Sequence, residues 1–327
     1  MPRSSVVAWY READQYFSRM QGASEAIRDP RRIFNCDESG FALNGESGRK
    51  VSVLAGCGDK NVYARVFGGK AQVTMHACFS ASGEVMAPTL LYPGMRLPPN
   101  IRAYGWPQAN YISTEKGWMD SEAFVQWLGF FNLWVISLAV QKPVILFIDG
   151  YPAHLSWMAA DFCKRNGIIL YCFLANCSHI LQPCDMGLFG PMKPAWRNAV
   201  GDWGRNHANT AFCRLHVPAP LKVAWEAVIS PALCINAFRK AGIFPFTHKD
   251  LPADKFISEI PRGTPPIPAG APPIPHGAAA IAPGANAYPA DVPYEAADVP
   301  APGMAETPTR HALTHNRTAP NANPLNS

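Results

Sequence analysis

Two short, wholly apolar runs constrain the fold of this chain most. They are VILFI at 144–148 and IILYCFL at 168–174, and a segment of helical character closed by Gly167 separates them. Apolar runs of this length are typical of strands that are buried on both faces of a sheet. We therefore expect an α/β architecture with these runs among its central strands.

The segments around the two runs extend this order. Shorter β-runs divided by Gly and Asn occupy residues 33–92, and SASG is a good hairpin turn between the last two; the runs are RIFNCD, KVSVLA, QVTMHACFS and MAPTLLY. Ser121 is a plausible N-cap for the longest helix. Helical patterns cover residues 6–28, 121–140, 154–165, 185–207 and 221–240. The order predicts a mixed sheet that begins as an antiparallel meander and is flanked by helices.

The composition divides the chain near residue 261. Residues 261–327 hold 15 prolines among 67 residues, with few large apolar side chains. Such a segment cannot bury enough surface to offset the entropy cost of ordering it. We expect a linker helix region at 1–32, a folded domain at 33–250 and a disordered Pro- and Ala-rich tail at 251–327.

Charge and cysteine usage exclude several classes of protein. The net charge of +5 permits a nucleic-acid partner but does not require one. Nine cysteines without a CxxC pair argue against a disulfide framework. The first twenty residues contain no apolar signal-peptide core, and Asn132 and Pro143 interrupt the most apolar window, 130–148. We expect an intracellular protein without a membrane partner.

Acidic residues lie where apolar strands end. Asp37 ends the run IFNC, Asp149 ends VILFI, and Asp185 stands at the start of a helix. A carboxylate at such a position is costly to bury without a partner, and a divalent cation supplies one. The alternative is that each Asp is a turn or cap residue, as Asp usually is. No one of these three acids alone indicates a metal site, and only the three taken together favour it over turn or cap roles.

Three motifs around these acids resemble the pogo/Tigger/jerky group of DDE transposases, the DDE superfamily endonucleases. RIFNCDESGFAL is similar to the family's first-Asp motif, LFIDGYPAH to the second, and CSHILQPCDMGLFGPMKPAW to the third. The 35 residues between Asp149 and Asp185 match the family spacing. Cys184 and Tyr151 depart from the usual residues, but neither change removes a carboxylate. The resemblance covers about residues 10–250.

The resemblance implies an RNase H-like fold and metal-dependent cleavage or strand transfer of DNA. Asp37, Asp149 and Asp185 would hold two magnesium or manganese ions, with Asp37 shared between them. His154, His179 and Gln182 are candidate orienting residues, although helix capping or structural hydrogen bonds would explain them equally well. Glu38 should face away from Asp37, because neighbouring side chains of a strand point to opposite faces.

The expected partner is DNA, which implies a nuclear location, and a homodimer is possible. Lys193 and Arg197 are four residues apart on one helix face and are candidates for phosphate contacts, although a solvated face explains them as well. Related transposases carry helix-turn-helix domains upstream, and only about 32 residues precede Ile33, so we expect that element to be missing. The alternative function is a domesticated, non-catalytic domain that binds DNA or protein.

A zinc site is a less favoured alternative. Four possible ligands fall within 13 residues, namely Cys172, Cys177, His179 and Cys184. Their spacing matches no common zinc pattern.

Overall fold

The structure, a computed structural model, describes residues 2–43, 72–207, 209–249, 251 and 255–256. The chain divides into two units, Met1–Val292 and Pro293–Ser327, and every described residue belongs to the first. The predicted β-run KVSVLA and the Pro-rich segment from 261 onward lie outside the described residues.

The described residues form a six-stranded mixed sheet with the order β4-β3-β2-β1-β5-β6. Its strands are β1 (Ile33–Ala42), β2 (Gln72–Ser80), β3 (Thr89–Pro93), β4 (Asn110–Thr114), β5 (Val144–Ile148) and β6 (Ile168–Cys172). Strands β1, β2 and β3 pair antiparallel, whereas β5 and β6 run parallel to β1. An antiparallel meander followed by two parallel strands is the RNase H-like arrangement, so the predicted fold class is confirmed.

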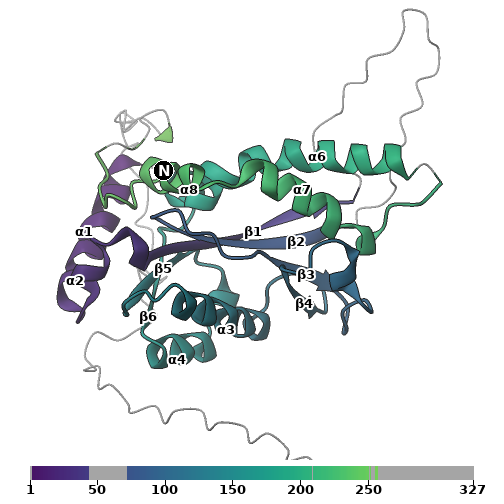
Figure 1. Ribbon diagram of the computed structural model, residues 1–327. Helices are drawn as coiled ribbons and strands as arrows, with labels where there is room; N and C mark the ends of the chain where they lie inside the picture. Colours follow the sequence, from purple (N-terminus) through teal and green to yellow (C-terminus); the bar gives the residue numbers. More distant parts are fainter. Residues whose placement is uncertain (1, 44–71, 208, 250, 252–254, 257–327) are drawn as a thin grey trace, which may run out of the picture. The chain divides into compact units, whose positions relative to one another are not determined.

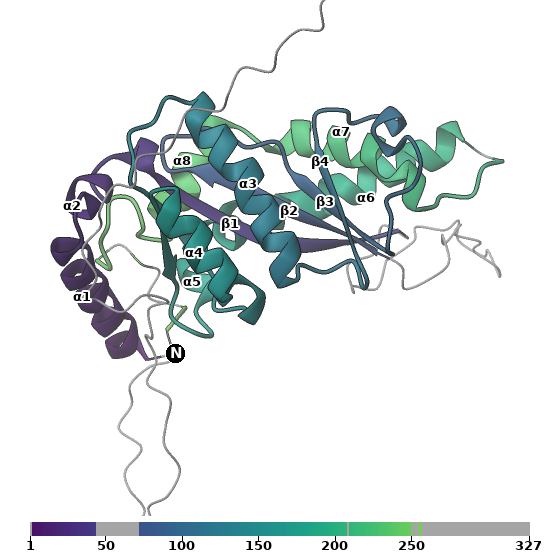
Figure 2. The same ribbon diagram turned by 90° about the horizontal axis from the view of Figure 1, so that it is seen from below.

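Helices cover both faces of the sheet (Figures 1 and 2). The helices of three or more turns are α1 (Arg3–Arg19), α3 (Ser121–Ser137), α6 (Phe189–Asn206) and α7 (Pro218–Val228). The shorter ones are α2 (Ala23–Ala26), α4 (Trp157–Arg165), α5 (Ser178–Leu181) and α8 (Pro231–Lys240). Short 3₁₀ segments are η1 (Pro30–Arg32), η2 (Ile101–Tyr104), η3 (Pro152–Leu155) and η5 (Arg214–His216), and η4 (Cys184–Leu188) is a π-helical turn.

Strand alternation sorts the core into two layers. Ile33 and Phe147 face one layer, which they share with α1, α6, α7 and α8. Phe34 and Ile148 face the other, which is built with α3 and α4. Because successive side chains of a strand point to opposite faces of the sheet, the position of an acid along β1 decides which of the two layers its side chain faces.

The sequence prediction differs from the structure at several element boundaries. The expected helix over 6–28 is broken between α1 and α2, where Gly22 has a φ of 73°. The N-cap of α3 is Asp120, not Ser121, since the Asp120 side chain accepts a 2.8 Å hydrogen bond from the Ala123 N–H. The meander is also interrupted, because the edge strand β4, which we did not predict, pairs parallel with β3.

The folded body extends past the predicted boundary at 250. Leu251 is buried in the core, and Phe256 packs against it. Apolar side chains beyond α8 therefore continue the layer that contains α1.

Among the described residues, no single helix is long and apolar enough to cross a membrane. One pair, Arg214–Val228 and Pro231–Lys240, meets the length and composition criteria only when the two are joined across a 71° bend.

Candidate active site

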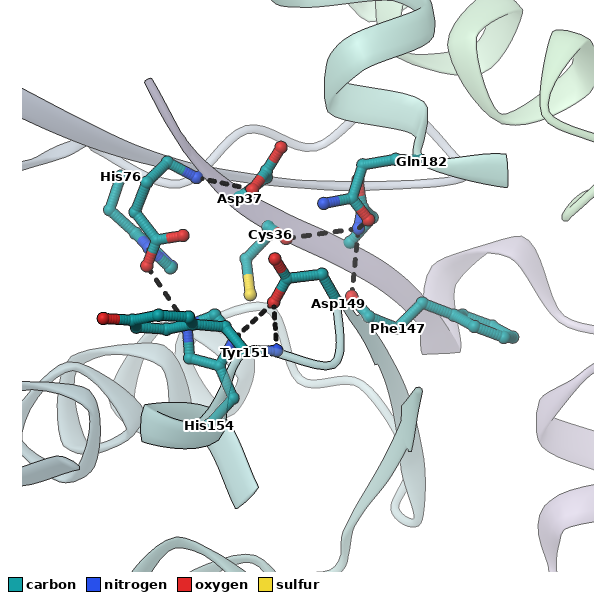
Figure 3. A network of polar contacts seen from close by, with 10 residues as sticks. Cys36, Asp37, His76, Phe147, Asp149, Tyr151, His154 and Gln182 are labelled. Carbon is teal, nitrogen blue, oxygen red and sulfur yellow. Dashed lines mark hydrogen bonds and ion pairs between the residues drawn. The ribbon is translucent and has the colours of Figure 1, made fainter. Parts of the chain in front are cut away.

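The parallel pairing of β1 with β5 places two of the predicted acids at the same end of the sheet. Asn35 and Phe147 are the last pair in register, and Asp37 and Asp149 each follow two residues later in the chain. Neighbouring strands are about 4.8 Å apart. Asp37 is buried and Asp149 is about one-third exposed, and Figure 3 shows both at this end of the strands.

Asn35 ties the segment that carries the third acid to the same place. Its Nδ2 donates to the Phe147 carbonyl at 3.0 Å and to Gln182 Oε1 at 3.3 Å. Its Oδ1 accepts a 3.0 Å hydrogen bond from the Cys184 N–H. One buried amide therefore joins β1, β5 and the start of η4, on which Asp185 follows Cys184 directly.

Asp185 lies within electrostatic reach of both other carboxylates, Asp37 and Asp149. Burial raises the pKa of Asp37 well above its usual range, and the negative charges of Glu38 and Asp185 raise it further. Partial desolvation raises the pKa of Asp185 as well, followed by the charge of Asp149. Carboxylates that repel one another in this way favour a bound cation.

His154 lies between Asp149 and the carboxylate of Glu38 and contacts both (Figure 3). Its Nδ1 lies 2.8 Å from Asp149 Oδ1, and its Nε2 lies 3.2 Å from Glu38 Oε1. Burial disfavours the charged imidazole, but the hydrogen bonds to Asp149 and Glu38 outweigh this and raise the pKa of His154 to about 9. Ser156, not His154, caps helix α4.

Glu38 faces away from Asp37, as the strand alternation predicts. Its Oε1 also lies 3.0 Å from Nδ1 of the buried His76. Burial alone would raise the pKa of Glu38, but His76 and His154 hold it well below its usual range. The sequence analysis did not identify His76, and its place on an apolar strand gives no signal for this role.

The other candidate orienting residues occupy different positions. Gln182 is buried and hydrogen-bonds to Asp37, which partly offsets the rise in the pKa of that carboxyl. His179 is exposed, and its charge lowers the pKa of Asp185. Both therefore lie beside an acid of the site, but only Gln182 is held inside the core.

The two predicted phosphate-contacting residues differ in their surroundings. Lys193 donates a hydrogen bond to the Gly40 carbonyl, and its Nζ lies 4.4 Å from the centroid of the Phe41 ring. Arg197 is exposed on α6. The sequence analysis also missed Lys255, which donates to the His179 carbonyl at 2.7 Å and lowers the pKa of Asp185 by its charge.

The acids suit a hard divalent ion better than zinc. Magnesium takes one or two carboxylates, with water and phosphate oxygens as its remaining ligands, and this is the donor set that the three Asp offer. Within the described ranges, no three His, Cys, Asp or Glu side chains converge closely enough to ligate one ion by themselves. This finding applies to the zinc alternative at Cys172, Cys177, His179 and Cys184, and it applies equally to the three Asp as a closed set of ligands.

The chain resembles known proteins both in sequence and in structure. The family described as DDE superfamily endonuclease matches residues 70–237, a segment that contains Asp149 and Asp185 but begins after Asp37. The MFS-type transporter clz9 of Cochliobolus lunatus is 27% identical over 217 residues, which are 65% of this chain and 23% of that protein. The chain thus spans about a quarter of the length of that relative.

Solved structures of the Mos1 transposase resemble the chain. The Mos1 mariner paired end complex with Mn has a TM-score of 0.44 and 18% identity, covering 71% of this chain and 57% of that one. The Mos1 catalytic domain with Raltegravir and Mn has a TM-score of 0.41 and 16% identity, covering 71% and 86%. The family match spans just over half of the 327 residues, and the chain therefore belongs to the DDE superfamily endonucleases.

Proposed function

We propose that this domain is a metal-dependent DNA endonuclease that cleaves, or transfers strands at, phosphodiester bonds. Asp37, Asp149 and Asp185 are its metal-binding residues. The observation that supports the proposal is the buried Asn35 amide, which joins the three segments on which these acids lie.

The donor chemistry of the site supports this function. Three carboxylates provide oxygen ligands for magnesium or manganese, and the charge of Asp185 acts on Asp37 as that of Asp149 acts on Asp185. A divalent ion held there would activate an attacking hydroxyl and stabilise the leaving oxygen.

The surrounding residues have distinct tasks in this proposal. His154 orients Asp149 by a direct hydrogen bond, and Gln182 does the same for Asp37. Arg197, exposed on the helix that follows Asp185, is available for a DNA phosphate. Such contacts position DNA without specifying its sequence, so we propose weak cleavage with little sequence preference.

The test is nicking of a supercoiled plasmid in manganese by the wild type and by Asp149→Asn. The substitution removes a ligand charge but preserves the shape of the side chain, so it should abolish nicking and leave DNA binding intact. Asp161→Asn is the matched control, because Asp161 lies on the surface of α4 and pairs only with Arg165 among the described residues. Equal nicking by wild type and Asp149→Asn would assign the activity to a contaminant.

A non-catalytic DNA-binding domain is the second candidate. It is favoured by the finding that no three side chains in the described part of the chain converge on one ion. Salt-sensitive DNA binding by the wild type, without nicking in either manganese or magnesium, would support this candidate.

A further inference from the structure

Glu38 stands next to Asp37 in the chain but on the opposite face of the sheet. Its neighbours there are the imidazoles of His76 and His154, and His76 in turn packs against Trp127 of α3. We propose that Glu38, supported by His76, is a positioning residue that sets the orientation of the Asp149 carboxylate through His154. This inference rests on the proposed function in one respect, since it takes Asp149 as a metal-binding residue.

A single oxygen of Glu38 holds both imidazoles. Oε1 lies 3.0 Å from His76 Nδ1 and 3.2 Å from His154 Nε2. His76 is 1% exposed, and its ring packs edge-on against Trp127 with centroids 4.3 Å apart. Glu38 is therefore anchored on a ring that the core holds in place.

His154 connects Glu38 to Asp149 by hydrogen bonds from its two ring nitrogens. Both of its ring nitrogens are engaged by carboxylates, so rotation of the ring would break two hydrogen bonds at once. Phe124 packs against the ring at a centroid distance of 4.4 Å, and Tyr151 approaches it edge-on at 5.6 Å. The imidazole has one orientation that satisfies all four neighbours.

As a result, the two oxygens of Asp149 differ in their hydrogen bonding. Oδ1 accepts from His154 Nδ1 at 2.8 Å and from the Tyr151 N–H at 3.1 Å. Of the described residues, none donates a hydrogen bond to Oδ2, which leaves that oxygen available to a ligand. Outer partners that fix a ligating carboxylate in this way typically change metal affinity by about 10–100-fold when they are removed.

A purely structural network would make the same contacts, so the test must separate orientation from stability. Glu38→Ala removes the acceptor for both imidazoles, whereas Glu38→Gln keeps an oxygen of the same size without the charge. Glu226→Gln is the matched control, because Glu226 is exposed on α7 and pairs only with Lys222 among the described residues.

Three measurements are made on each purified full-length variant. Urea unfolding gives stability, titration calorimetry gives Mn²⁺ affinity, and ¹⁵N spectra of histidine side chains without metal report the His154 ring. The His154 signals are assigned by their loss in His154→Gln.

We expect Glu38→Ala to shift the His154 signals and to weaken Mn²⁺ binding by about 10–100-fold. Glu38→Gln should fall between Glu38→Ala and the wild type, and Glu226→Gln should match the wild type. Unchanged His154 signals in folded Glu38→Ala would overturn the inference, whatever its stability.

Two further outcomes are also decisive. If Glu38→Ala does not fold, wild-type His154 signals in Glu38→Gln would overturn the inference and shifted ones would support it. If the wild type itself binds no Mn²⁺, the proposed function fails, and the metal-free spectra still decide whether Glu38 positions His154.

Discussion

Asn35→Ala should destabilise the protein more than any exposed amide substitution, because Asn35 is fully buried and joins three segments. The Cys184 N–H would lose its partner, which costs about 1–3 kcal/mol. Loss of the hydrogen bond to the Phe147 carbonyl adds about 0.5–1.5 kcal/mol. We therefore expect the free energy of unfolding to fall by about 1.5–4.5 kcal/mol.

Urea unfolding followed by tryptophan fluorescence measures this change, provided that the slope with denaturant is the same in both proteins. Asn198→Ala is the control, since Asn198 is exposed on α6, and it should change stability by less than about 0.5 kcal/mol. A loss below about 1 kcal/mol for Asn35→Ala would refute the reasoning. It would mean that the segment of Asp185 is held in place by apolar packing and not by this amide.

Three other substitutions test separate features. Asp120→Ala removes the N-cap of α3 and should cost about 1 kcal/mol in urea unfolding, whereas Asp120→Asn should cost much less. Gly187→Ala places a Cβ 2.5 Å from the Cβ of Ala237, so it should lower the melting temperature and, by displacing η4, weaken Mn²⁺ binding; unchanged values would show that α8 yields easily. Burial disfavours ionised Glu84, but hydrogen bonds from Ser80 and Ser82 lower the pKa of Glu84 below the ordinary 4.5. Its contribution to stability is therefore present above pH 4.5 and lost as the pH falls, so acid unfolding of Glu84→Gln should depend less on pH below 4.5 than that of the wild type.

Local pattern was enough to predict the strands β1, β2, β3, β5 and β6 and the long helix α3. Runs such as VILFI can be stable in water only when both faces are covered, so their burial follows from composition. The acids that follow these runs were equally visible, although a single Asp at the end of a strand is usually a turn or cap residue. The motif resemblance then related Asp37, Asp149 and Asp185 to one another across more than a hundred residues.

The edge strand β4 was missed for the opposite reason. Its sequence NYIST is short and partly polar, and it becomes a strand because β3 offers a free edge for parallel pairing. Asp120 had only the general interpretation of a turn or cap residue, and Ser121 was preferred as the N-cap of α3. A shift of one residue decides which of the two side chains reaches the Ala123 N–H.

The sequence by itself determined the layers of the fold and the identity of the acids, because both depend on the hydrophobicity and spacing of neighbouring residues. The tertiary structure alone decided how those acids are held. Asn35 meets Cys184 across 149 positions, and Glu38 meets His154 across 116. A hydrogen bond requires donor and acceptor within about 3 Å. Which polar side chains satisfy that condition depends on strand register and helix packing, and no local pattern encodes either.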